Sequence, residues 1–226
     1  MFPALSLVLA SMAAPVPPES EAQRIVRLWG EVLDPDKGST ISMPDRGKLR
    51  LLAGPGPRGI NPAYQLNNAP RTLREVKGDF TATVRIVKDA PAEGVTRAGS
   101  NFLLAGGGGM LLWVSDEMHL RLGRSQWPSE NGSQPKTTYS LRGVVNGDDM
   151  DVSQKTVNAF EFKPVTLKLK RAGNTLQASY SFDEKTWEKY EPLEAELPET
   201  VKLGVYAAHN FNKPLEVVFE PLNVAK

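Results

Sequence analysis

Apolar and polar residues alternate along most of this 226-residue chain. The clearest stretch runs from 106 to 124, where glycines and large apolar residues precede the turn-forming sequence Ser115-Asp116-Glu117. After that turn, apolar residues at 118, 120 and 122 alternate with His119, Arg121 and a glycine. A period of two places successive side chains on opposite faces of a β-strand. The stretch therefore predicts two paired strands, each with one buried and one polar face.

The same alternation recurs at 80–87, 165–170 and 176–182, and turn signals separate the alternating segments. Asn146-Gly147 is the strongest of these signals, because this dipeptide is typical of two-residue hairpin turns. Only 193–196 has a helical composition, and it is too short for a stable helix. The chain is therefore predicted to be all-β, an antiparallel two-sheet β-sandwich that forms a single domain over 25–226.

The N-terminus differs from the rest of the chain. Residues 2–14 are apolar and small, too few to span a bilayer, and a proline-rich stretch follows. This pattern predicts a secretory signal peptide over 1–14 and a linker over 15–24. The protein is then secreted, periplasmic or on the cell surface. An apolar N-terminus without that role is the alternative, since no Lys or Arg precedes the apolar run.

Composition and charge exclude several classes of function. The net charge is +1, which is far from the basic character typical of nucleic-acid-binding proteins. No cysteine is present, which rules out disulfides, thiolate metal sites and cysteine nucleophiles. No segment after the N-terminus has the length and apolar character of a membrane span.

A series of short motifs resembles one family. In order along the chain it comprises Trp29-Gly30, Asn68-Ala69-Pro70-Arg71 with Gly78-Asp79-Phe80, Leu111-Leu112-Trp113, Arg171-x-Gly173-Asn174, Tyr180-Ser181-x-Asp183-x-x-x-Trp187, and Lys202-x-Gly204-x-Tyr206. This series resembles the DUF1349 group, within the concanavalin A-like lectin/glucanase jelly rolls, over roughly 28–223. The resemblance implies a jelly roll whose concave sheet commonly faces glycans. It implies no specific activity.

Side chains on the polar face have the chemistry of a carbohydrate site. Sugar sites combine an aromatic ring, which covers C–H groups, with planar donors that bind hydroxyls. The predicted ligand-binding residues are Arg85, Trp113, His119, Arg121, Tyr206, His209 and Asn210. The alternative is an ordinary solvated sheet, whose arginines pair with acidic residues and whose aromatic residues are buried. The favoured function is a non-catalytic glycan- or polysaccharide-binding domain.

Two other functions stay open. The first is a polysaccharide-degrading enzyme, because Lys202-x-Gly204-x-Tyr206 is similar to a strand of jelly-roll alginate lyases and Tyr206 with a histidine would move the proton. The companion Q-[IV]-H motif is absent, and so is the paired-carboxylate strand of the glucanases, so no catalytic residue is assigned. The second is a protein-interaction domain that uses a long loop over 126–163.

The sequence offers little to a metal or cofactor. Asp148, Asp149 and Asp151 lie close to Asn146 and offer hard oxygens to Ca²⁺, but the spacing of an EF-hand is not met, and a solvated turn is favoured. Asp183 is predicted to cap its own turn, with Trp187 packed beneath it. Neither of these features identifies a ligand.

Overall fold

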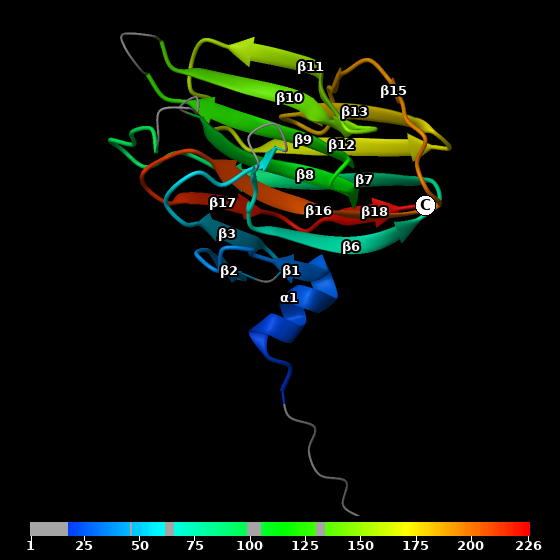
Figure 1. The fold of residues 1–226 in the computed structure, drawn as a ribbon, viewed down its shortest axis with the longest axis horizontal. Helices are drawn as coiled ribbons and strands as arrows, with labels where there is room; N and C mark the ends of the chain where they lie inside the picture. Colours follow the sequence, from blue (N-terminus) through cyan, green and yellow to red (C-terminus); the bar gives the residue numbers. More distant parts are fainter. Residues whose placement is uncertain (1–17, 46, 62–65, 99–104, 130–133) are drawn as a thin grey trace, which may run out of the picture.

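The computed structural model describes residues 18–45, 47–61, 66–98, 105–129 and 134–226. It is a sandwich of two large antiparallel sheets, as the alternation predicts (Figure 1). The predicted signal peptide over 1–14 lies outside the described residues. Among those residues, no helix has the length and apolar character needed to cross a bilayer.

Sheet A has seven strands. In spatial order they are β1 (Glu31–Leu33), β6 (Arg71–Lys77), β16 (Thr200–His209), β8 (Gly106–Ser115), β9 (Met118–Trp127), β10 (Lys136–Val145) and β11 (Asp148–Val157).

Sheet B packs against one face of sheet A. Its main path is β14 (Glu188–Lys189), β13 (Thr175–Ser181), β12 (Val165–Ala172), β7 (Phe80–Lys88), β17 (Leu215–Phe219), β3 (Leu49–Ala53) and β2 (Thr40–Ser42). Two short strands lie beside that path: β15 (Leu193–Glu194) pairs with β13, and β18 (Asn223–Ala225) pairs with β7.

The core lies between the two sheets. Alternation along β7 is regular: Ala82, Val84 and Ile86 are buried, and the residues between them are partly exposed. Sheet A contributes Met110, Leu112 and their neighbours to the same cluster. The strands predicted at 80–87, 165–170 and 176–182 are therefore confirmed, together with their buried faces.

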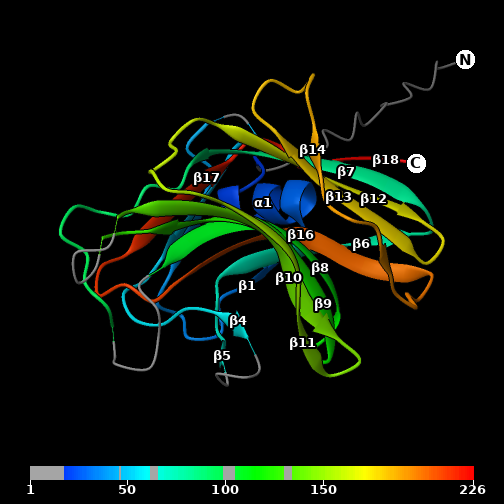
Figure 2. The same ribbon diagram turned by 90° about the horizontal axis from the view of Figure 1, so that it is seen from above.

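Sheet A is curved, and a small third sheet lies on the inner side of its bend. In Figure 2 the long strands β8 to β11 arch away from sheet B, and β4 (Ile60–Asn61) and β5 (Leu66–Asn67) lie under the arch. A second apolar cluster, which includes Ile60, Leu73 and Leu111, joins this segment to sheet A. One part of the concave face is thus covered, and the rest is open.

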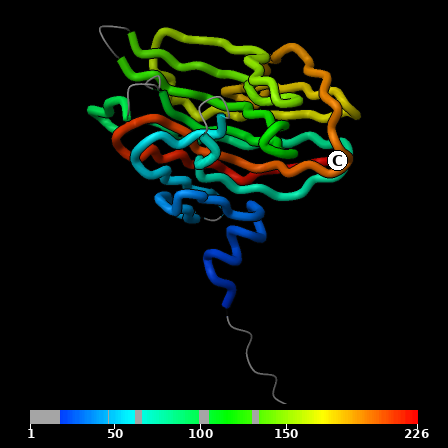
Figure 3. Tube along the Cα trace, in the orientation of Figure 1, coloured from blue at the N-terminus to red at the C-terminus, as the bar shows by residue number. Residues whose placement is uncertain are grey.

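The predicted linker over 15–24 is wrong from residue 21 onward, because helix α1 (Glu21–Trp29) begins there. Ser20 and Gln23 form a capping box, in which each side chain satisfies the backbone N–H of the other. Ile25 and Trp29 lie one turn apart and are buried in the core. The helix covers the end of the sandwich where β1, β2 and β6 lie (Figure 3).

One further expectation agrees with the structure and one is corrected. Residues 193–196 are not helical, as their short length predicts, and β15 forms there and pairs with β13. The segment 126–163 is not one long loop, because β10 and β11 form a hairpin that extends sheet A by two strands. Its two-residue turn at Asn146-Gly147 has positive φ at both positions, as this dipeptide predicts.

Candidate functional site

The open part of the concave face contains a hollow of about 290 Å³. Part of its floor is bare backbone, because a glycine of the central strand β8 lines it. Gly107 lines the hollow, and a Cβ there would lie 1.9 Å from the Arg124 carbonyl oxygen. At Gly123 a Cβ would lie 2.6 Å from the Tyr206 hydroxyl oxygen. The glycine-rich stretch that begins β8 therefore creates the depression as well as allowing the strands to pack closely.

Two of the predicted site residues meet in this hollow. Arg121 on β9 and Tyr206 on β16 both line it. Tyr206 is only 9% exposed, and burial raises the pKa of its hydroxyl, while the nearby positive charges of Arg121 and Arg142 lower it. The phenol is therefore neutral at physiological pH and can both donate and accept a hydrogen bond.

Arg121 is the unusual group of the hollow. Within the described part of the chain its side chain forms no ion pair or hydrogen bond, and its Nε is buried without a partner. Burial lowers the pKa of its guanidinium, and the proximity of Tyr206 and Asp149 opposes that effect. A guanidinium stays protonated despite such a shift. The hollow thus presents a half-buried cation whose hydrogen-bonding capacity is not used by any described residue.

The hairpin β10–β11 supplies the opposite wall. Arg142 Nε and Nη2 donate to the two carboxylate oxygens of Asp151 at 3.2 and 2.9 Å, and Nη2 also donates to Gln154 Oε1 at 2.9 Å. Ser140 and Ser125 add hydroxyls to the lining. Because each partner orients the other, Arg142 and Asp151 present a fixed pair of donor and acceptor groups.

Trp113 and His119 lie on the same face but outside the hollow. Their rings stack with centroids 4.9 Å apart, and the Arg71 guanidinium lies 5.1 Å from the tryptophan ring. His119 is 1% exposed, and burial and the Arg121 charge lower its pKa. The predicted floor of Trp113, His119, Arg121 and Tyr206 is therefore divided: two residues face the open hollow, and two pack near the covered part.

His209 and Asn210 serve the fold. His209 Nε2 lies 2.9 Å from the Gly54 carbonyl oxygen, and Nδ1 accepts a hydrogen bond from the Phe211 N–H. Burial lowers the pKa of His209 to about 4. The Asn210 side chain accepts from the Ala105 N–H. Both of these predicted ligand residues have their polar groups engaged by backbone, and neither lines the hollow.

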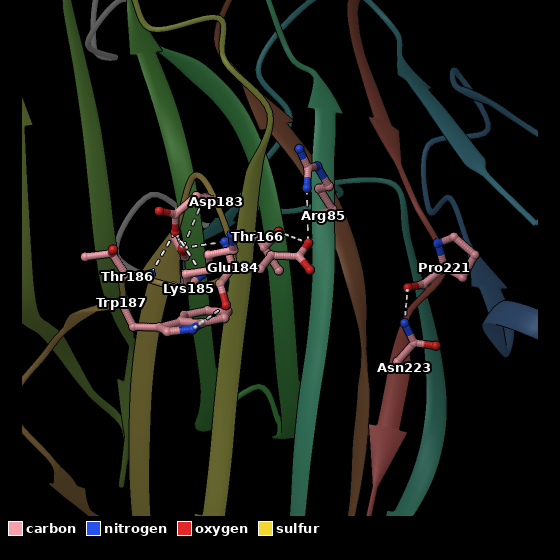
Figure 4. A network of polar contacts seen from close by, with 10 residues as sticks. Arg85, Thr166, Asp183, Glu184, Lys185, Thr186, Trp187, Pro221 and Asn223 are labelled. Atoms are coloured by element: carbon pink, nitrogen blue, oxygen red, sulfur yellow. Dashed lines mark hydrogen bonds and ion pairs between the residues drawn. The ribbon is translucent and has the colours of Figure 1, made fainter.

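Arg85 lies on the other side of the molecule, which corrects its prediction as a concave-face residue. It belongs to β7 of sheet B, where Nη1 donates to Glu184 Oε1 at 3.1 Å (Figure 4). Asp183 Oδ1 accepts from the Lys185 and Thr186 N–H groups, so its predicted turn-capping role is confirmed. Trp187 closes this turn by donating to the Glu184 carbonyl.

The carboxylates proposed for Ca²⁺ do not form a metal cluster. No group of three His, Cys, Asp or Glu side chains able to hold a metal ion occurs among the described residues. Asp151 is paired with Arg142, and Asp148 lies outside the hollow that Asp149 and Asp151 line. The three carboxylates considered for Ca²⁺ are therefore not brought together around one point in the described structure.

No family model and no curated protein matches the chain. Solved structures do. A functionally unknown protein from Saccharomyces cerevisiae has a TM-score of 0.63 at 16% identity, over 86% of this chain and 95% of that one. The GH43 protein BlXynB from Bacillus licheniformis has a TM-score of 0.57 at 17% identity, over 82% of this chain and 34% of that one. An alginate lyase from Klebsiella pneumoniae has a TM-score of 0.53 at 10% identity, over 82% and 83% of the two chains.

The fold is that of the concanavalin A-like β-sandwiches. At these identities the similarity concerns the fold alone. The chemistry of the hollow must therefore be argued from its own residues.

Sequence reasoning did not assign Ser140, Arg142 or Asp151 to the site, although the strand composition of Thr137–Val145 and the Asn146-Gly147 turn predict a hairpin here. A returning strand after that turn places Asp151 opposite Arg142, as the observed register shows.

Proposed function

We propose that the hollow on sheet A binds a glycan without chemical turnover. The observation that carries this proposal is Arg121, a half-buried guanidinium without a partner in the described protein, aimed into a polar depression beside the Tyr206 hydroxyl. A buried cation that lacks acceptors is costly, and a ligand oxygen would supply the missing hydrogen bonds. The hydrogen-bond donors of the hollow are thus already in place before an oxygen-rich ligand binds.

The mixture of donors and acceptors favours a sugar over a simple anion. Arg121 and Arg142 donate, the carboxylates of Asp149 and Asp151 accept, and the serine and tyrosine hydroxyls do both. Sugar hydroxyls also donate and accept, so each can satisfy two neighbours in such a site. Ligand sites span about 300–1,000 Å³, and a hollow of about 290 Å³ fits one sugar unit at the end of a chain or at a branch.

Two further expectations accompany this proposal. Membership of the DUF1349 group is supported by the ordered motifs of the sequence. A location outside the cell or in the periplasm is supported by the apolar residues 2–14, and extracellular glycans would be accessible there.

The enzyme alternative has weaker support. Tyr206 faces the hollow, but neither His119 nor His209 lines it, so the expected tyrosine–histidine pair for proton transfer is not assembled. A lyase would produce unsaturated sugar ends that absorb in the ultraviolet. No increase in absorbance during incubation with acidic polysaccharides is the result expected of a binding domain.

Calorimetric titration with a panel of oligosaccharides tests the proposal. Arg121→Gln should lower the affinity for the best ligand about 10- to 100-fold, because it removes charge-assisted hydrogen bonds of roughly 1.5–3 kcal/mol. Arg85→Gln is the matched control: it removes a half-buried arginine from sheet B and should change the dissociation constant less than about twofold. Equal losses in both variants, or no binding by the wild type, would contradict the proposal.

A further inference from the structure

The outer face of sheet B carries a second depression that the proposed function does not use. It has a volume of about 460 Å³ and crosses the adjacent strands β7, β12, β13 and β14. Neighbouring strands lie about 4.8 Å apart, so three intervals give a length of roughly 14 Å. This depression, lined by Lys168, Lys170 and Lys189 together with polar residues, is called the lysine track below.

The charge of the lysine track is uncompensated. No Asp or Glu among the described residues lines it. Lys168, Lys170 and Lys189 form no ion pair with any described residue, whereas Lys48, Lys77, Lys88, Lys155 and Lys202 each do. The Lys189 charge lies close enough to Lys168 to add to burial in lowering its pKa. Three cations therefore converge on one depression without internal neutralisation.

One of these cations is held in place. Lys168 Nζ lies 3.2 Å from the centre of the Trp187 ring, a cation–π contact. Trp187 is fixed in turn, because its Nε1 donates to the Glu184 carbonyl at 3.1 Å within the turn that Asp183 caps (Figure 4). The turn that Asp183 caps thus acts as a support, and Trp187 is a positioning residue for the charge of Lys168.

We propose that the lysine track binds an anionic polysaccharide, a chain that bears sulfate or carboxylate groups, independently of the hollow on sheet A. Charge complementarity selects the anion, because the track offers three cations and no carboxylate. Hydroxyl and amide groups of Thr81, Gln177 and Ser179 lie between the lysines and suit the hydroxyls of a sugar. Among the described residues, no arginine and no open aromatic platform lines the track, and both are typical of single-stranded nucleic-acid sites.

The test uses the full chain and three probes of equal length: dextran sulfate, a polyuronate and uncharged dextran. Both charged probes should bind and dextran should not, and the tighter of the two identifies the anion. The double variant Lys170→Gln/Lys189→Gln should weaken charged-probe binding about tenfold, since each lysine contributes to counterion release. Lys48→Gln/Lys77→Gln has the same change in net charge and should weaken it less than about twofold.

Positioning by Trp187 has its own readout. Trp187→Leu should weaken charged-probe binding by about two- to fivefold, and Trp187→Phe should restore most of that loss, because a phenyl ring keeps the cation–π contact. Thermal unfolding of both variants reports whether the turn still folds. An equal loss of charged-probe affinity in the Trp187→Leu and Trp187→Phe variants would show that contact between the ring and Lys168 has no role in binding.

Three results would overturn the proposal: no charged probe binds, the two double variants lose affinity equally, or a single-stranded oligonucleotide of equal charge binds more tightly than both polysaccharides. Failure here is distinct from failure of the proposed function. The Lys170→Gln/Lys189→Gln variant changes nothing in the hollow, so any neutral glycan bound by the wild type should bind it equally well.

Discussion

The two outer faces of this sandwich differ in the signs of the charges that line their depressions. On sheet A the hollow contains both signs, with Arg142 paired to Asp151 and Arg121 half-buried beside Tyr206. On sheet B the lysine track contains cations alone, and two of its three lysines are exposed. A balanced hollow selects a ligand through the geometry of hydrogen bonds, whereas a cationic track selects it through charge.

The difference originates in a few positions of otherwise similar strands. Both faces are made by the polar half of a period-two pattern. Glycines at 107 and 123 remove side chains from sheet A and leave room for a ligand near the backbone. Lysines at 168 and 170 fill the same kind of position on β12 with long flexible cations. Shape therefore distinguishes one face, and charge distinguishes the other.

Acidification should have the largest effect, and it should act through the fold that both faces share, because His209 is buried at the end of β16. Its pKa falls from 6.5 when unfolded to about 4 when folded, so between these pH values only the unfolded chain binds the proton. Stability should therefore fall as pH drops through this window, by up to roughly 3 kcal/mol.

Denaturant unfolding at pH 7 and pH 5 checks the predicted loss of stability on acidification. His209→Asn should be less stable at pH 7, since the contacts to Gly54 and Phe211 change, but the pH dependence should be smaller than in the wild type. If the free energy of unfolding of the variant depends on pH as strongly as that of the wild type, the acid sensitivity comes from groups other than His209.

Salt should distinguish ligand binding at the two faces. Three lysine contacts to a densely charged polymer predict a loss of roughly 20- to 40-fold in affinity between 50 and 200 mM salt. Binding of a neutral oligosaccharide in the hollow should change by less than about twofold over this range, because no counterion is released. Parallel titrations at the two salt concentrations measure both. Equal salt dependence would mean that one site binds both ligands.

Asp151→Ala should lower the affinity of the hollow for its ligand by about three- to tenfold. The substitution removes an acceptor and frees Arg142 from its fixed position. The pair is partly exposed, so the free energy of unfolding should change by less than about 1 kcal/mol. Calorimetry and denaturant unfolding measure the two quantities. A large loss of stability with no loss of affinity would make the pair a purely structural feature.

Lys202→Gln should have the smallest effect. Lys202 lies on sheet A but pairs with Glu31 at 3.4 Å, and both side chains are exposed. Such pairs contribute about 0–1 kcal/mol, so stability and affinity at either face should stay within error of the wild type. A measurable loss of affinity would extend the binding surface beyond the hollow.

Much of the fold followed from the sequence, because alternation reports burial directly. Strands such as β7 and β12 appear as unbroken period-two runs, and their inward residues were predicted correctly. Helix α1 was missed although Ser20 and Gln23 form a recognisable capping box. Its nine residues lie beside the proline-rich N-terminus, and only Ile25 and Trp29 are buried, so the apolar spacing of this helix is a weak signal.

The site was harder to predict, because alternation separates inside from outside but does not say which sheet a strand joins. Arg85 and Arg121 have the same pattern, yet they lie on opposite outer faces of the sandwich. Packing by the β4–β5 segment over Trp113 and its neighbours also depends on contacts distant in sequence. Strand order and loop packing carry the missing information.

Chemical-shift mapping of the isotope-labelled protein during titration with its best neutral oligosaccharide is the most direct test of glycan binding in the hollow. We expect the largest shifts at Arg121, Ser125, Ser140 and Tyr206 and at the hairpin residues 149–151, with none along β12 or β13. Shifts confined to sheet B, or to surface loops away from these residues, would contradict the account.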